Sequence, residues 1–288
     1  MKTTIQTEQA TEVSDAFMME TTTPLWSVVI TDETGHVLFE KNPKNILSIA
    51  SGGKVLLLLA IAEKYDDTEL HQLYLHRRTT QSVADSGLWQ FLDTEQLTAH
   101  DLVVLVSSVS DNWATNELLD LVGLSAVRDV ARSWGLLDTE LLDRVRDVRN
   151  PRDDAVAPRL AHGSARELCA LVRQLHHSAV GTPGFRVARW LGTNTDLSLV
   201  ASAFGLDPLA HHETGEVLEL WNKTGTDVGV LADVGVVTGP QGTVCFAVLV
   251  NAEASEQNQV SRMSLRAEMR LWGERIIGIT GPTQTSTH

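Results

Sequence analysis

The sequence is poor in cysteine, in long apolar runs and in recognisable metal ligands. Its 288 residues include two cysteines, Cys169 and Cys245. Both lie in apolar segments, which predicts two free, buried thiols, although one disulfide is arithmetically open. The longest strongly apolar run, residues 55–62, is far shorter than the roughly 20 residues that a membrane-spanning helix needs. The sequence therefore predicts no transmembrane helix.

No spacing of cysteine and histidine predicts a zinc site. The 10 histidines are scattered or stand in adjacent pairs, and sequence neighbours do not converge on one metal from a helix face. We therefore expect neither a metal nor another cofactor. The formal net charge is -14, and so acidic a surface repels phosphate backbones and anionic lipids. As partners we expect small-molecule substrates, with no nucleic acid and no membrane.

The first residues are polar and acidic and lack the apolar stretch of a secretory signal. As given, the chain predicts a cytoplasmic protein, or a secreted one if a leader has been removed. Apolar residues make up 43% of the chain and charged residues 21%, as in an ordinary globular enzyme.

Hydrophobic periodicity predicts a mixed α/β (α+β) fold. Strands are expected near both ends of the chain, at residues 25–31, 36–40, 216–221, 228–238 and 244–251. Because two strands alone make no stable sheet, all five should join in one largely antiparallel sheet. Terminal helices, predicted at residues 11–20 and 257–277, should flank it.

The middle of the chain predicts an all-α lobe. Helices are expected at residues 49–64, 102–109, 114–121, 126–134, 165–177 and 185–191, with a charged, proline-bounded loop at residues 141–158. We therefore predict an α/β lobe from residues 1–50 and 213–288 and a helical lobe from residues 51–212. The active site is expected in the crevice between the two lobes.

Three short motifs offer chemistry on the walls of this crevice. Ser51-Gly-Gly-Lys54 opens the apolar helix, and a spacing of three residues puts the serine and the lysine on one helix face. A buried amine loses its proton more easily than a free one and can then act as a base for the hydroxyl. The structural alternative is a capping serine and a lysine whose amine extends to the surface.

Ser110-Asp-Asn112 breaks two predicted helices. It is either a capping turn, or a site in which Ser110 relays a proton and Asn112 binds substrate. The third motif, Lys223-Thr224-Gly225, follows the strand expected to end at residue 221. The structural alternative is an ordinary strand end.

Read functionally, Lys223 and Thr224 hold an anionic substrate, and Gly225 lets the backbone pass close to it. The N–H groups of Ser51 and Thr226 would then face each other as an oxyanion hole.

Together and in this order, the three motifs resemble those of the class A β-lactamase family of penicillin-recognising serine hydrolases. The resemblance spans roughly residues 20–278. It implies an all-α lobe packed on an α/β lobe, with Ser51 as acylated nucleophile and Lys54 as proton acceptor. It further implies Ser110 as the relay to the leaving nitrogen, Asn112 as a contact to the substrate amide, and Lys223 with Thr224 as a carboxylate-binding pair.

The chain departs from the family in the loop that begins at Leu142-Asp-Arg144. The family's loop has a glutamate two residues after that arginine, where this chain has Arg146. The family's asparagine four residues further on is kept as Asn150. That glutamate is the base that activates the deacylating water. The loop is also shortened, the strand at residues 228–238 has no arginine to help hold a carboxylate, and an export signal is absent.

The leading hypothesis is a serine hydrolase that forms an acyl-enzyme at Ser51 with a β-lactam, a related amide or an ester. Deacylation of β-lactams is expected to be slow. A second hypothesis is a genuine β-lactamase, acting in β-lactam breakdown and antibiotic resistance, that activates its water by another route. The two remaining hypotheses are a β-lactam-binding sensor without turnover and an inactive homologue. Arg146 itself either affects deacylation or simply pairs with Asp143, Asp147 or Asp153.

Overall fold

The computed structural model describes residues 23–78, 83–150, 152–154, 156–211, 218–253 and 259–281, with the backbone alone at residues 259–262. Within these ranges no helix is long and apolar enough to cross a membrane. The helix predicted at residues 11–20 lies outside the described residues, as do residues 216 and 217 of a predicted strand.

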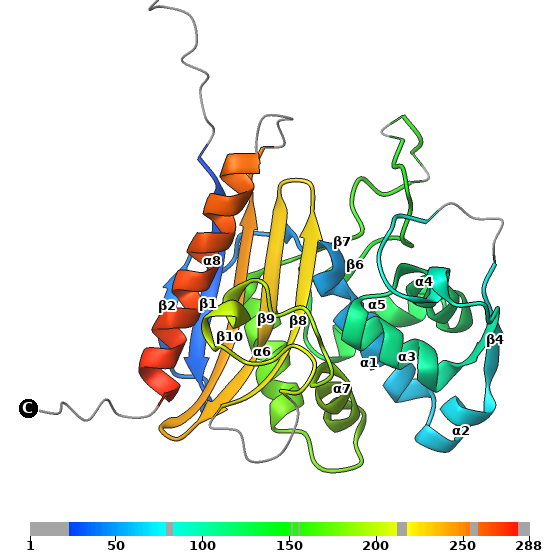
Figure 1. The fold of residues 1–288 in the computed structure, drawn as a ribbon, viewed down its shortest axis with the longest axis horizontal. Coiled ribbons are helices and arrows are strands. Elements are labelled where there is room, and N and C mark those ends of the chain that lie inside the picture. The colour runs from blue at the N-terminus through cyan, green and yellow to red at the C-terminus, as the bar shows by residue number, and fades with distance from the viewer. Residues whose placement is uncertain are drawn as a thin grey trace, which may run out of the picture.

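Five antiparallel strands form the main sheet, in the order β2-β1-β10-β9-β8 (Figure 1). The strands are β1 (Leu25–Asp32), β2 (Val37–Lys41), β8 (Glu219–Asp227), β9 (Val230–Gly239) and β10 (Gly242–Asn251). β1 pairs with β10, which confirms that strands from the two ends of the chain join in one sheet. The β1–β2 turn contains Gly35 at φ +91°, a backbone conformation that favours glycine.

One long helix covers each face of the sheet. α8 (Gln259–Thr280) packs on one face, where Met269 and Phe246 share a buried cluster (Figure 1). α6 (Ala165–His176) covers the other face, where Leu171 and Val234 belong to a second cluster. Successive strand residues point to alternate faces, and each face lies against one of these two apolar clusters. Both faces of the sheet are therefore apolar.

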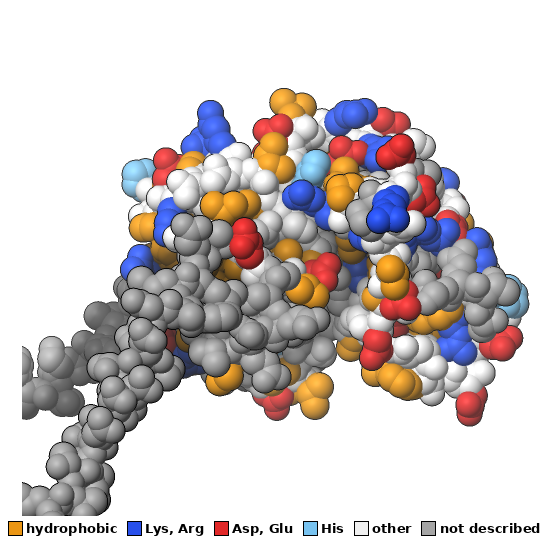
Figure 2. Space-filling view, turned by 90° about the horizontal axis from the view of Figure 1, so that it is seen from above, with side chains coloured by type: hydrophobic (Ala, Val, Ile, Leu, Met, Phe, Trp, Pro, Cys, Tyr) orange, Lys and Arg blue, Asp and Glu red, His pale blue; other side chains and the backbone are white. Residues whose placement is uncertain are grey.

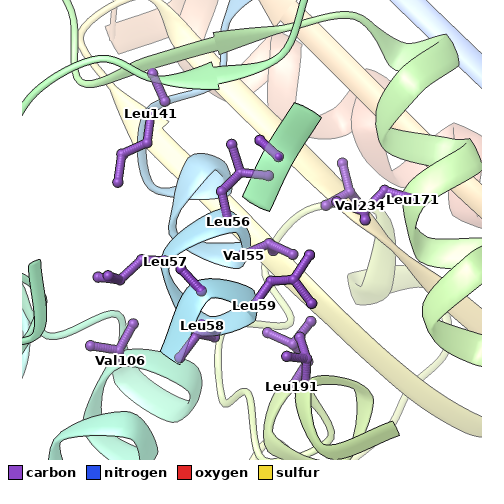
Figure 3. Close-up of a cluster of buried hydrophobic side chains, with 14 of the residues drawn as sticks. Val55, Leu56, Leu57, Leu58, Leu59, Val106, Leu141, Leu171, Leu191 and Val234 are labelled. Atoms are coloured by element: carbon purple, nitrogen blue, oxygen red, sulfur yellow. The ribbon is translucent and has the colours of Figure 1, made fainter. Parts of the chain in front are cut away.

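α1 (Lys54–Lys64), which the tight 3₁₀ turn η1 (Ala50–Gly53) precedes, packs against α3 (Ala99–Val109), α4 (Asn112–Val122), α5 (Leu124–Ser133) and α7 (Pro183–Leu191). α2 (Asp67–Gln72) packs on α3, and the short 3₁₀ turns η2 (Trp89–Phe91) and η3 (Val200–Ala203) lie beside α4 and α8. Figure 3 shows the consecutive α1 side chains from Val55 to Leu59 pointing toward different neighbours, among them Val106, Leu191 and Val234. All five are buried, as the sequence predicted for this helix.

Two smaller sheets connect the helices. β3 (Leu47–Ser48), β7 (Ala161–Gly163) and β6 (Glu140–Leu141) form one, and β4 (Tyr74–His76) pairs with β5 (Gln96–Thr98) in the other. The predicted charged loop begins at Leu141, the last residue of β6, and its other described residues lie before β7 and form neither helix nor strand. Cys169 and Cys245 are both free and buried, as expected.

The structure corrects two predicted boundaries. The helix expected from residue 49 begins with the η1 turn, and α1 itself starts at Lys54. β8 does not end at residue 221 but continues to Asp227, because β9 turns back after two residues and pairs with its whole length. Lys223, Thr224 and Gly225 therefore lie within an edge strand. The division into two lobes stays a prediction, and the larger apolar cluster runs from α1 to the sheet.

Candidate active site

Ser51 lies in the η1 turn at the start of α1 and is partly exposed. The residue before it, Ala50, has φ +45°, a left-handed conformation that is unfavourable for a residue with a Cβ. Within the described part of the chain the Ser51 hydroxyl makes no hydrogen bond. The predicted contact from the Lys54 amine to this hydroxyl is thus not formed as a hydrogen bond.

The Lys54 amine is fully buried and points to the turn between α3 and α4. Its Nζ donates to the Ser110 carbonyl oxygen at 2.6 Å, to Asn112 Oδ1 at 2.7 Å and to Ser110 Oγ at 3.2 Å. Burial, followed by the nearby Lys223 charge, holds the pKa of Lys54 well below its usual range, and Asp111 opposes the shift only partly. A low pKa favours the neutral amine, the form that can accept a proton; this form has two N–H groups and donates at most two of the three bonds.

The turn that holds Ser110 is built by its own neighbours. Ser110 ends α3 in a left-handed conformation, with φ +57°. Asp111 then caps α4 by accepting the Ala114 N–H at 2.9 Å. Asn112 follows as the first residue of α4, and its Nδ2 donates to the Ala84 carbonyl at 2.8 Å. Its side-chain amide therefore already contacts the protein on both sides, at Lys54 and at Ala84.

Lys223 approaches the same hydroxyl from the sheet. Its fully buried Nζ donates to Ser110 Oγ at 3.1 Å and to the Thr224 carbonyl at 2.9 Å. Burial lowers the pKa of Lys223 to about 8, against the opposing charges of Asp196 and Asp233. Ser110 Oγ thus lies between two buried lysine amines.

Gly225 brings β8 against the η1 turn. A Cβ at this position would lie 2.0 Å from the Ile49 carbonyl oxygen and 2.7 Å from the Gly52 nitrogen, so only glycine allows this approach. Thr226, the next residue, is partly exposed. Thus β8 lies directly beside the turn that carries Ser51. The oxyanion hole expected from the N–H groups of Ser51 and Thr226 stays a prediction.

The structure adds an acidic residue that the sequence analysis missed. The Thr224 hydroxyl donates to Asp196 Oδ2 at 2.7 Å, and the Ser198 hydroxyl donates to Asp196 Oδ1 at 2.6 Å. Burial raises the pKa of Asp196, but the bonds from Ser198 and Thr224 and the Lys223 charge outweigh it and bring the pKa below its usual value. Asp196 is therefore a carboxylate at neutral pH.

A second acid lies behind β8, in β9. Asp233 is fully buried opposite Thr224, and it accepts the Asn222 amide at 2.8 Å, while Asn194 donates to Asn222 at 2.8 Å. Burial raises the pKa of Asp233 to about 7. A lone acid in an otherwise apolar strand was the signal that could have revealed it. Across the described residues, no group of three or more His, Cys, Asp or Glu side chains could hold a metal.

In the loop between β6 and β7, Arg146 pairs with Asp143. Its Nε lies 2.7 Å from Oδ2 and its NH2 lies 3.1 Å from Oδ1, and Arg149 also donates to Oδ2 at 2.7 Å. Asn150 is exposed and accepts the Arg152 N–H at 3.0 Å, so the structure does not bring it to the lysines.

Basic and acidic side chains also lie beside one another over the described part of the face in Figure 2.

Comparisons with known proteins agree with the fold. The model of the Beta-lactamase enzyme family matches residues 9–268. The β-lactamase of Sphaerobacter thermophilus DSM 20745 is 24% identical, with TM-score 0.72, and the match covers 90% of this chain and 93% of that one. PBP-A is 19% identical, with TM-score 0.70 and coverage of 90% and 91%. A PBP-A mutant in an acyl-enzyme complex with penicillin-G is 20% identical, with TM-score 0.68 and coverage of 88% and 89%. No curated protein matches the sequence significantly.

These structural likenesses show the fold, and the family model shows the family. The protein is a serine hydrolase of the β-lactamase type. The chain belongs to the beta-lactamase enzyme family.

Proposed function

We propose that this hydrolase forms an acyl-enzyme at Ser51 with a β-lactam, a related amide or an ester. The observation that carries the proposal is the hydrogen-bonded series Lys54–Ser110–Lys223, which accompanies the partly exposed Ser51 in one site. Buried amines with lowered pKa values and a hydroxyl between them suit proton transfer rather than simple structural support.

In the first step, Ser51 Oγ attacks the acyl carbon and its proton passes to the neutral Lys54 amine. Backbone N–H groups of Ser51 and Thr226 stabilise the oxyanion, where Gly225 allows the close approach of the two backbones. As the C–N or C–O bond breaks, Ser110 gives its proton to the leaving group and recovers one from Lys54. Water then hydrolyses the ester at Ser51 and regenerates the hydroxyl.

We propose that the last step is slow for β-lactams. The loop has Arg146 where the resemblance expects a glutamate, and this arginine is engaged by Asp143. A guanidinium keeps its proton at any relevant pH and cannot act as a general base. A β-lactam acyl-enzyme should therefore accumulate. The acyl group that a small ester leaves on Ser51 should be hydrolysed more readily, by water that Lys54 activates. The same observation favours a second candidate, a β-lactam sensor that is acylated once.

The test follows covalent labelling by intact-protein mass spectrometry with two donors, a fluorescent penicillin and a small activated ester. We expect both to acylate Ser51, the penicillin adduct to persist and the ester to turn over. The Ser51→Ala variant should fold and should label with neither. Labelling of that variant at the full rate would place the nucleophile elsewhere. Rapid penicillin turnover without an adduct would favour a genuine β-lactamase, and an adduct with no turnover of either donor would favour the sensor.

A further inference from the structure

We infer that Asp196 makes this site selective for acyl donors that are uncharged beside Lys223 and Thr224, and that it disfavours donors with a carboxylate there. Asp196 is a specificity-determining residue in this assignment, because it supplies from within the protein the carboxylate that an anionic substrate would otherwise bring. The inference rests on the proposed function, and it concerns the substrate class of the same site.

The hydrogen bonds of Thr224 carry the first step of the argument. A threonine hydroxyl has one proton to donate, and here that proton goes to Asp196 Oδ2 at 2.7 Å. Lys223 donates two of its three N–H groups, one to Ser110 Oγ and one to the Thr224 carbonyl. A substrate carboxylate at this place would have to take the hydroxyl proton away from Asp196, and two carboxylates would then compete for one donor.

The charges around the position point the same way. The Lys223 cation is balanced by the Asp196 carboxylate, and Asp233 lies behind it on β9. β9, the strand next to this position, contains no arginine. Arg266 from α8 donates to Ser198 Oγ at 2.7 Å, so this partly exposed cation is linked to Asp196 through the serine hydroxyl. A further negative charge would therefore lie beside Asp196 without a cation of its own.

A cavity lined in part by Asp196 offers room for an uncharged group. It has a volume of about 320 Å³, and its lining includes Asp196, Ser198, Ser202, Leu197 and Leu206. The segment that forms it runs between α7 and β8 and crosses in front of the sheet, drawn yellow-green in Figure 1. Hydroxyls and aliphatic side chains suit a neutral group with mixed polarity.

The experiment uses a matched pair of acyl donors, penicillin G and its methyl ester, which differ in the carboxylate alone. The second-order rate of Ser51 acylation is measured for each by mass spectrometry. In the unmodified protein we expect the methyl ester to react about tenfold faster, the effect of like charges a few ångströms apart at a partly exposed site. Asp196→Asn, which keeps the acceptor for Thr224, should bring the two rates within about twofold, mainly because the free acid reacts faster.

Asp129→Asn is the matched control, since it removes the same charge from an exposed position on α5 and should leave the tenfold ratio unchanged. Faster acylation by the free acid in the unmodified protein, or a ratio that Asp196→Asn leaves in place, would overturn the inference.

A binding measurement separates this inference from the proposed function. Affinities of the same two compounds for the Ser51→Ala variant, with and without Asp196→Asn, are measured by calorimetry. If neither these compounds nor the small activated ester acylates the unmodified protein, the proposed function fails. The inference then holds if the ester binds tighter and Asp196→Asn removes the difference. It fails if the acid binds tighter, if the difference persists, or if neither compound binds.

Discussion

Two groups of residues in the molecule arrange their charges in opposite ways. In the lysine group (Lys54, Ser110 and Lys223), two buried amines converge on one neutral hydroxyl. In the loop group (Asp143, Arg146 and Arg149), two guanidiniums converge on one carboxylate. In the first arrangement, burial lowers the pKa values of both lysines toward the range in which protons move. In the second, the ion pairs with Asp143 hold two guanidiniums that keep their protons, which suits the holding of a loop rather than acid–base work.

Replacement of Lys54 should break this contrast most strongly. Lys54→Ala removes the proposed proton acceptor, so the rate of Ser51 acylation should fall by about 10²–10⁴-fold for every donor, the range typical of a lost general base. Lys64→Ala is the control, because Lys64 ends the same helix at an exposed position. Stopped-flow measurement of acylation checks this prediction. A loss no larger than that of the control would remove the amine from the chemistry.

Asp233, beside the lysine group, and Asp143, in the loop group, should contribute to stability with opposite dependence on pH. The pKa of Asp233, raised to about 7, lies above its unfolded value, so its contribution to stability is present below about pH 4 and is lost as the pH rises through 7. Between pH 5 and 8 the free energy of unfolding should fall by about 2 kcal/mol more in the unmodified protein than in Asp233→Asn. Urea titrations at both pH values measure this difference, and equal slopes in the two proteins would refute it.

Asp143 provides the contrast to Asp233. Burial raises its pKa, but the bonds from Arg146, Arg149 and the Arg144 N–H outweigh this and hold the pKa below its usual value. Its contribution should be present above the unfolded pKa, near 4, and lost as the pH falls below it. The free energy of unfolding that Asp143→Asn loses relative to the unmodified protein should therefore shrink as the pH falls. For Asp233→Asn the corresponding loss should shrink as the pH rises.

The sequence predicted the helices and strands well, but it predicted only some of the residues that hold the candidate site together. Alternating and helical patterns are local signals, so the strands, most helices and the three motifs could be read from neighbouring residues. Asp196 could not be found in this way, because it stands in a loop 28 residues before Thr224 and meets it only through the fold. The extension of β8 through Lys223 was missed for a similar reason, since pairing with β9 overrides the polar sequence there.

A carboxylate introduced into the loop should sharpen the comparison between the two groups. Arg146→Glu places an acid where the resemblance expects the deacylating base. It also breaks the ion pair with Asp143, so the new side chain will not be held in one position. We expect β-lactam acyl-enzyme to decay about tenfold faster, well short of a fully positioned base. Arg146→Gln controls for the lost ion pair, and equal decay in both variants would show that the carboxylate itself does nothing.

The smallest expected effect concerns the pH dependence of acylation. The pKa of Lys223 is about 8, so the cation that holds Ser110 Oγ is lost above this pH. The acylation rate should therefore fall a few-fold between pH 7.5 and 9.5. Lys223→Arg keeps its charge throughout this range and should show a flat profile, whatever its absolute rate. A rate that keeps rising in the unmodified protein would rule out a need for the Lys223 charge.

The left-handed backbone at Ala50 and Ser110 has a consequence for how this enzyme can evolve or be engineered. Both residues have a Cβ and would relax if the chain were free, so the η1 turn and the turn between α3 and α4 each cost on the order of 1 kcal/mol of folding free energy. Substitutions that relax these two turns would raise stability, but they would also move Ser51 and Ser110, the two hydroxyls of the proposed mechanism. Thermostable variants that keep their activity should therefore carry their stabilising changes elsewhere, on the outer helices and the sheet.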